Sequence, residues 1–168
     1  MKQSMIVLAL VLVTGTAHAQ PSQQAWYELT IEGMKADPKA TMTIESWSWG
    51  AVSPEADPAL GTKKGIQAQD LYLSVEQSST SPLLLEALVA ETVLPKVTLK
   101  LKDPVSKDKS FELVLKDVKV TSYQASGSGG GYGGGVPNES IALSFKTAKV
   151  TVGNGKTARS ADVTPGTH

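Results

Sequence analysis

Short segments in which apolar and polar residues alternate recur along this chain, and they limit what it can fold into. Three of them, residues 27–32, 70–76 and 97–102, alternate almost strictly. A period of two places the apolar side chains on one face of an extended strand, so each segment predicts a half-buried β-strand. The segment from Met42 to Trp49 has the same character. The chain is therefore expected to be mainly β, with one face of each strand buried in a shared core.

Two later segments change phase. In residues 111–120 and again in residues 141–152, the apolar side chains move from odd to even positions half-way along. One extra residue would restore a continuous buried face, which predicts β-bulges near Lys116–Asp117 and near Lys146–Thr147. A second explanation is that each strand buries first one face and then the other, as when a helix packs outside a barrel. The sequence alone does not separate these two accounts.

One segment predicts a short α-helix, at about residues 82–90. Ser81 is expected to cap the free backbone donors, and Pro82 fits the first helical position. An apolar stripe follows, made of Leu84, Leu85 and Leu88. A helix this short is marginal in water, so the stripe is expected to pack on the sheet rather than to form a groove for a partner.

The N-terminus has the features of a signal peptide. Lys2 precedes nine unbroken apolar residues, Met5–Val13, and Ala17 and Ala19 fit the small-residue rule for cleavage. A helix that spans a bilayer needs about 20 apolar residues, which argues against the alternative of an uncleaved anchor. We therefore expect residues 1–19 to be removed, Gln20 to become the N-terminus, and the mature protein to be periplasmic or secreted.

Charge and cysteine content argue against a protein that binds nucleic acid or a membrane surface and against a fold stabilised by disulfides. Removing 19 of 168 residues leaves 149, enough for one domain with its own core. Lys plus Arg and Asp plus Glu number 16 each, and loss of Lys2 leaves a net charge of −1. Such a balance gives no basic footprint for nucleic acid or for a membrane surface. Without cysteine, an exported fold must rely on its core alone.

Few residues are available for catalysis or metal binding. The chain has no cysteine, and its two histidines are His18, in the leader, and His168, the last residue. This composition excludes Ser-His-Asp and Cys-His catalysis and the usual zinc sites from the folded part. A carboxylate-based hydrolase is the remaining enzymatic reading, but no pair of acids stands out. We therefore predict no catalytic residue, no cofactor and no metal ion.

Three connections lack periodicity. The glycine-rich run of residues 127–135 contains a formal G-x-G-x-x-G, but a strand follows it, so it predicts a flexible hairpin tip. Residues 51–65 form a long connection of the kind that is usually functional or disordered. Residues 154–168 are polar and are expected to be a disordered tail, which leaves residues 20–153 as the folded domain.

The order of these parts resembles the haemolysin-coregulated protein family, Hcp, the tube protein of type VI secretion. The resemblance is carried by the signature strand Thr43–Gly50, which ends in Trp47, Ser48, Trp49 and Gly50, and by the segments Gln69–Leu73, Ser79–Leu84, Val97–Lys100, Phe111–Tyr123 and Glu139–Val152. It covers about Tyr27 to Val152. It implies an Hcp-like β-barrel of two sheets with one helix packed outside.

The resemblance also implies a function without a reactive centre. Hcp-like chains form six-membered rings that stack into a tube and carry effectors, so the expected partners are other copies of this chain and secreted effector proteins. The long loop is then implied to mediate ring stacking, with the candidate residues Pro54, Glu55, Asp57, Lys63 and Lys64. Lys63 and Lys64 either pair with acids of a neighbouring subunit or remain solvated, and exposed pairs contribute little.

Two features depart from the family pattern. Family members carry no signal peptide, and they usually continue past the equivalent of Val152 to one more strand. A missing strand would leave a sheet edge open to pairing with another chain. The alternative function is therefore a monomeric periplasmic or secreted binding module that has lost the ring. Trp47 and Trp49 would form a binding platform in such a module, but tryptophans at alternate positions more often fill a core.

Overall fold

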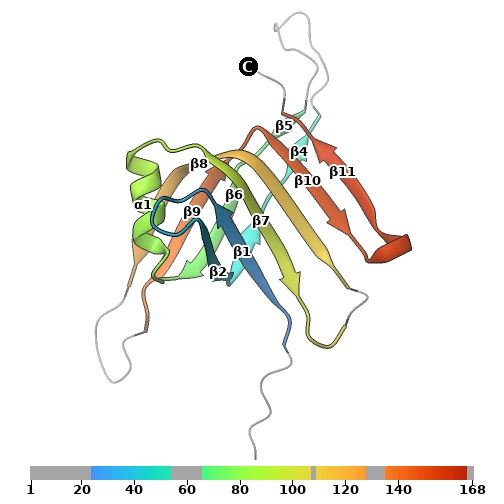
Figure 1. The fold of residues 1–168 in the computed structure, drawn as a ribbon, viewed down its shortest axis with the longest axis horizontal. Helices are drawn as coiled ribbons and strands as arrows, with labels where there is room; N and C mark the ends of the chain where they lie inside the picture. The colour runs from blue at the N-terminus through green and yellow to red at the C-terminus, as the bar shows by residue number, and fades with distance from the viewer. Residues whose placement is uncertain (1–23, 54–65, 107–108, 128–134, 166–168) are drawn as a thin grey trace, which may run out of the picture.

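The computed structural model describes residues 24–53, 66–106, 109–127 and 135–165, and these form two β-sheets that close around one core, with a single helix at one end (Figure 1). The wide sheet has the strand order β2-β1-β7-β8-β10-β11, and the narrow sheet has the order β8-β9-β6-β3. The strands of the wide sheet are β1 (Trp26–Glu32), β2 (Lys39–Ile44), β7 (Leu94–Lys102), β8 (Phe111–Ser126), β10 (Thr147–Val152) and β11 (Arg159–Val163). The narrow sheet adds β3 (Ser46–Ser48), β6 (Leu71–Glu76) and β9 (Asn138–Ser144). All strand pairs are antiparallel.

The barrel closes at two corners where the chain passes from one sheet to the other. β8 pairs with β7 and β10 in its first half and with β9 in its second half. At the other corner only Glu45 separates β2 from β3, and its backbone N–H donates to the Ser74 carbonyl at 3.0 Å. These two bends let the inner faces of both sheets share one core, which is the mainly β architecture that the alternation predicts.

The phase change in β8 occurs without the extra residue that the sequence predicts near Lys116–Asp117. Leu113, Leu115, Val118 and Val120 belong to one core cluster, while the intervening Lys116 and Asp117 are exposed. Asp117 has φ of 50°, in the left-handed region, but the pairing with β7 keeps one register from Lys100↔Glu112 to Leu94↔Val118, so no residue is inserted there. The register shift itself lies further along, between Val120 and Ser122 against β9. The bulge predicted near Lys116–Asp117 is therefore wrong, and the buried side chains of β8 change phase there within an unbroken register.

The second phase change has a different cause. The predicted continuous strand from Ile141 to Val152 is two strands, because Phe145 and Lys146 interrupt it between β9 and β10. β9 belongs to the narrow sheet and β10 to the wide sheet, so the break lies at the corner where β8 bends. A break between sheets replaces the bulge expected near Lys146–Thr147.

The helix α1 (Ser81–Val89) lies where the sequence predicts it, but two of its details differ. Thr80, not Ser81, is the N-cap, and no side chain caps the helix. Ser81 is instead buried, and its hydroxyl accepts from the Ser78 N–H at 2.9 Å. The buried stripe contains Leu84 and Ala87, whereas Leu85 is 44% exposed and faces away from the core.

The prediction of a disordered tail at residues 154–168 is wrong for most of that segment. The short helix η1 (Gly155–Thr157) turns the chain back, and β11 then pairs with β10 from Val152↔Arg159 to Ala148↔Val163. The sequence hides this strand because only Ala161 and Val163 are apolar in it. The further strand that the sequence appeared to lack is therefore present, and the open sheet edge belongs to β11 rather than β10.

Candidate functional site

The signature strand contributes its two tryptophans to the packing around the core. The Trp47 ring stacks on Phe111 with centroids 5.0 Å apart and meets the edge of Tyr27 at 5.5 Å. Trp49 lies 6.2 Å from Phe145. Both tryptophans are half-buried against the core cluster, so they fill space between the sheets instead of forming an exposed platform.

The other signature residues connect this strand to its neighbours. The Gly50 carbonyl accepts from the Gln69 N–H at 2.9 Å, and β4 (Ala51–Val52) then pairs with β5 (Gln67–Ala68). Among the described residues, Trp49 Nε1 is a buried donor without a hydrogen-bond partner. This two-stranded arm is the base of the long loop. The candidate stacking residues Pro54, Glu55, Asp57, Lys63 and Lys64 lie outside the described residues, as do Ala17, Ala19 and Gln20 at the expected cleavage site.

A buried carboxylate joins α1 to the narrow sheet. The Glu139 side chain has no exposed surface, and it accepts from the Ser81 hydroxyl at 2.7 Å and from the Tyr123 hydroxyl at 2.6 Å. The hydrogen bond to Glu139, with burial and the carboxylate charge, raises the pKa of Tyr123 from 10.0 to about 12. The sequence analysis missed this group. Its signal was an acid at position 139, in phase with the apolar Ile141 and Leu143.

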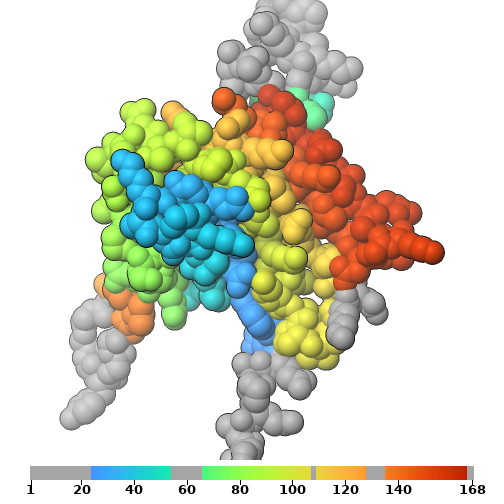
Figure 2. Space-filling model, viewed as in Figure 1, coloured from blue at the N-terminus to red at the C-terminus, as the bar shows by residue number. Residues whose placement is uncertain are grey.

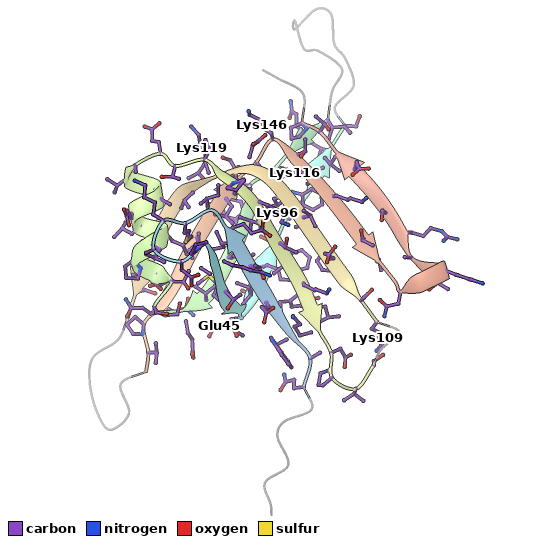
Figure 3. The ribbon with its side chains drawn as sticks, in the orientation of Figure 1. Glu45, Lys96, Lys109, Lys116, Lys119 and Lys146 are labelled. Carbon is purple, nitrogen blue, oxygen red and sulfur yellow. The ribbon has the colours of Figure 1, made fainter. Side chains whose placement is uncertain are left out.

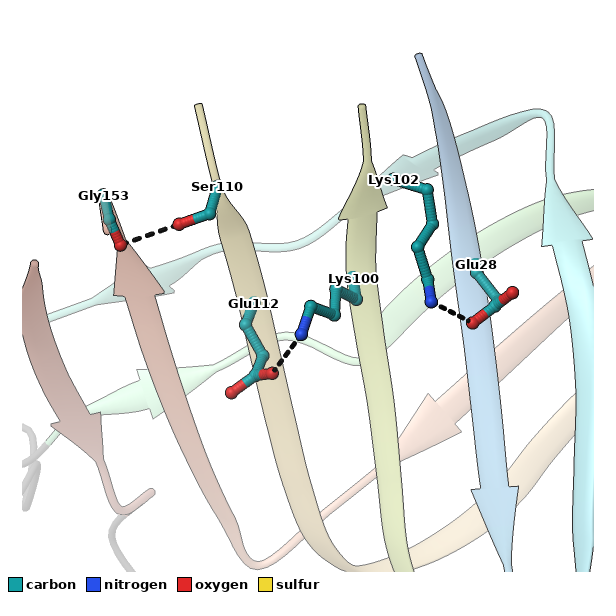
Figure 4. Close-up of polar contacts among 6 residues, drawn as sticks. All are labelled: Glu28, Lys100, Lys102, Ser110, Glu112 and Gly153. Carbon is teal, nitrogen blue, oxygen red and sulfur yellow. Dashed lines mark hydrogen bonds and ion pairs between the residues drawn. The ribbon is translucent and has the colours of Figure 1, made fainter. Parts of the chain in front are cut away.

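The outer face of the wide sheet is charged. A cross-strand ion pair joins Lys96 to Glu32 at 2.7 Å. Figure 4 shows two more, in which Lys102 lies 2.9 Å from Glu28 and Lys100 lies 3.6 Å from Glu112. Figure 3 shows Lys116, Lys119 and Lys146 near the corner where β8 bends, and there Lys146 lies 3.8 Å from Asp117. The paired side chains are between 31% and 78% exposed, so the pairs stabilise the fold only slightly.

The outer face of the narrow sheet is rich in hydroxyls and slightly hollow, and the Glu45 carboxylate lies at its margin, where it accepts from the Ser74 hydroxyl at 3.3 Å. Serines gather there from β3, β6, β8 and β9 around Tyr72, which is 54% exposed. The hollow has a volume of about 410 Å³ and is lined by Ser46, Ser48, Ser74, Ser122, Gln124 and Ser140 among others. An open, hydroxyl-lined face of this kind suits contact with another macromolecule better than enclosure of a small ligand.

No group of three or more metal-binding side chains occurs among the described residues. Within the same residues, the single buried carboxylate has its oxygens engaged by Ser81 and Tyr123, and no acid is paired with a second acid. No helix in the described part of the chain is long and apolar enough to cross a membrane.

The comparisons with known proteins decide the family. The model of the type VI secretion system effector family, Hcp, matches residues 26–152, which includes the whole barrel from β1 to β10. The chain belongs to the Hcp family. Its fold is that of a type VI secretion tube protein, and the family is one of structural secreted proteins.

Solved Hcp structures have the same fold at low sequence identity. Hcp1 from Salmonella typhimurium is 19% identical, with a TM-score of 0.64 over 84% of this chain and 98% of its own. A type VI secretion system effector from Yersinia pestis is 18% identical, with a TM-score of 0.61 over 82% of this chain and 98% of its own. The secreted protein Hcp3 from Pseudomonas aeruginosa is 14% identical, with a TM-score of 0.59 over 83% and 99%. No curated protein sequence matches the chain.

Proposed function

We propose that the mature chain assembles as a six-membered ring of the Hcp type, and that these rings stack into a tube that carries secreted effector proteins. The supporting observation is the family match over residues 26–152, which includes every strand from β1 to β10. A ring needs a head-to-tail contact between two different surfaces of one subunit. The ion-paired outer face of the wide sheet and the hydroxyl-rich outer face of the narrow sheet give the subunit two chemically distinct sides.

The molar mass in solution tests the ring. Light scattering of the purified mature protein should give about six times the monomer mass, as a closed ring of this symmetry requires. A monomer at high micromolar concentration would instead support the binding module, with the serine-lined hollow around Tyr72 as its contact surface.

We further propose that the loop above the β4–β5 arm mediates stacking through Pro54, Glu55, Asp57, Lys63 and Lys64. Deleting residues 54–62 should leave the ring mass unchanged and abolish filaments in electron micrographs. The arm itself pairs below the loop, so the deletion removes no described strand. Filaments that persist in the deletion variant would show that the loop has another role.

The leader places this ring outside the cytoplasm. We propose that cleavage after Ala19 releases a protein that begins at Gln20 and is periplasmic or secreted. N-terminal sequencing of the exported protein tests this directly, since retention of Met5–Val13 would indicate an uncleaved anchor.

A further inference from the structure

The wide sheet extends past the barrel, and its inner face is only partly covered there, since Val150 and Val163 contact the core but remain half-buried. Strands β10 and β11, here called the overhang, lie beyond β8 and pair with none of the strands β9, β6 and β3 of the narrow sheet (Figure 1). Leu113 on β8 is opposite Val150 on β10, which is opposite Ala161 on β11. Residues directly opposite each other in antiparallel strands share a face, so these three continue the core-facing side of the sheet.

Exposure rises along this face from the barrel to the edge. Leu113 is 0% exposed, Val150 is half-buried, and Ala161 is exposed. The next set of opposed residues on the same face shows the same trend: Phe111 is half-buried, Val152 is 53% exposed and Arg159 is exposed. The outer edge of β11 also has no strand partner among the described residues. An apolar face and an open edge on one element indicate a surface that another chain covers.

The helix α1 presents the matching feature. Its inner stripe packs on the core, yet its outer side carries Leu85 at 44% exposure and Val89 at 78%, with Val93 just beyond at 50%. Glu86 is its only charged residue. A helix that is apolar on both sides is expected to lie between two layers, and the described residues supply only one.

The two surfaces are complementary in charge and lie at opposite ends of the molecule. Glu86 and Glu91 are exposed beside the outer side of α1, and Lys156 and Arg159 are exposed at the end of the overhang. Lys35 lines the same small hollow as Glu86, and Arg159 also donates to the Ala158 carbonyl at 3.1 Å. Figures 1 and 2 show α1 at one end of the long axis and the overhang at the other.

We propose that the overhang of one subunit covers the outer side of α1 of the next copy of this chain, with Val152 and Ala161 against Leu85 and Val89. The contact joins two different surfaces, so it is heterologous and closes into a ring when the rotation between subunits permits. The proposal rests on the ring assembly proposed above and names the surfaces that form it.

A charge-exchange experiment tests this contact. The variant E86K/E91K makes both surfaces basic, and the variant K156E/R159E makes both acidic. Each variant alone should lose the oligomer mass of the wild type because like charges then meet. A 1:1 mixture should regain it, since a six-membered ring can alternate the two variants. All four positions are exposed, so the unfolding midpoints should match the wild type.

Each outcome is informative. If both variants retain the wild-type mass, or if the mixture does not regain it, the contact is overturned while the ring itself stands. Retention of the wild-type mass by both variants is also the result expected if the chain's own loop of residues 54–65, and not a second copy, covers the overhang. A wild-type protein that is already monomeric overturns the contact together with the proposed ring.

A crosslinking experiment gives an independent readout. The chain has no cysteine, so the variant V89C/A161C carries a single engineered pair. Mild oxidation should give a ladder of covalent multimers, because a disulfide requires Cα atoms roughly 4.4–6.8 Å apart. The control V89C/V105C moves the second cysteine to the exposed β7–β8 turn and should remain monomeric on a denaturing gel. A ladder with the control but not with the first pair would contradict the proposal.

Discussion

The centre of the wide sheet and its overhang have the same alternation of side chains but opposite surroundings. In the centre, Leu29, Leu99 and Leu113 are opposite one another across β1, β7 and β8, and all are 0% exposed because the narrow sheet covers them. In the overhang, Val152 on the same face is 53% exposed. The difference shows that the same alternation of side chains is buried where a second sheet packs on it and stays exposed where none does, and the exposed end is the surface that we propose another copy covers.

The largest expected effect comes from removing side-chain volume on the two parts of this face. Leu99→Ala should lower the free energy of unfolding by about 2–5 kcal/mol, because it leaves a cavity that the packed sheets cannot fill. Val152→Ala, the matched change in the overhang, should lower it by less than about 0.5 kcal/mol in the monomer. Urea unfolding of both variants measures the contrast, and equal losses would show that the overhang is buried within the subunit.

Two glycines allow a smaller test of the same contrast. Gly33 follows β1 and has φ of 92°, and a Cβ there would lie 2.4 Å from Pro95 Cδ. Gly153 follows β10 and has φ of 88°, and a Cβ there would lie 3.1 Å from the Thr157 carbonyl oxygen. Gly33→Ala should destabilise the whole fold by about 1–3 kcal/mol.

Gly153→Ala should act locally instead. The overhang is anchored at this turn by the Ser110 hydroxyl, which donates to the Gly153 carbonyl at 2.7 Å (Figure 4). We expect faster amide hydrogen exchange in β11 with little change in global unfolding. A global loss as large as that of Gly33→Ala would contradict a separable overhang.

The buried Glu139 predicts a dependence on alkaline pH. The pKa of Tyr123 is raised to about 12 in the folded protein, mainly by its hydrogen bond to Glu139. A raised pKa stabilises the fold below about pH 10, and this contribution disappears as the pH rises through about 12. The stability difference between the wild type and Tyr123→Phe should therefore shrink over this range. A difference that is constant from pH 8 to 12 would show that the hydrogen bond does not form.

The smallest effect is expected from the outer charges of the sheet centre. Lys96→Ala removes the 2.7 Å ion pair with Glu32, but both side chains are more than a third exposed. The loss should be at most about 1 kcal/mol and should decrease with added salt. If added salt does not reduce this loss of stability, the loss comes from packing of the Lys96 aliphatic chain and not from the ion pair.

The sequence predicted the centre of the molecule better than its margins. β1, β6 and β7 follow their alternation directly, because one side of each faces the core and the other faces water. β11 was missed because the overhang lacks a second layer, so the strand Arg159–Val163 has few apolar residues to reveal it. The helix was located, but its outward Leu85 was assigned to the core, since an apolar helix gives no sequence signal for which side is covered.

The candidate site was predictable only in part. The pattern around Trp47 and Trp49 indicated both the family and a core position, because large rings at alternate positions of a strand fill a core. The partnership of Glu139 with Ser81 and Tyr123 joins residues far apart in the chain, and no local pattern encodes it. The match between α1 and the overhang depends on where the two ends of the molecule lie, which only the fold determines.

The most direct test of the account is the mass of the 1:1 mixture of E86K/E91K and K156E/R159E, compared with each variant alone. The account predicts monomers from each variant and a six-subunit mass from the mixture, because only the mixture pairs a basic helix with an acidic overhang and an acidic helix with a basic one. A mixture that remains monomeric beside a wild-type protein of six-subunit mass would contradict it.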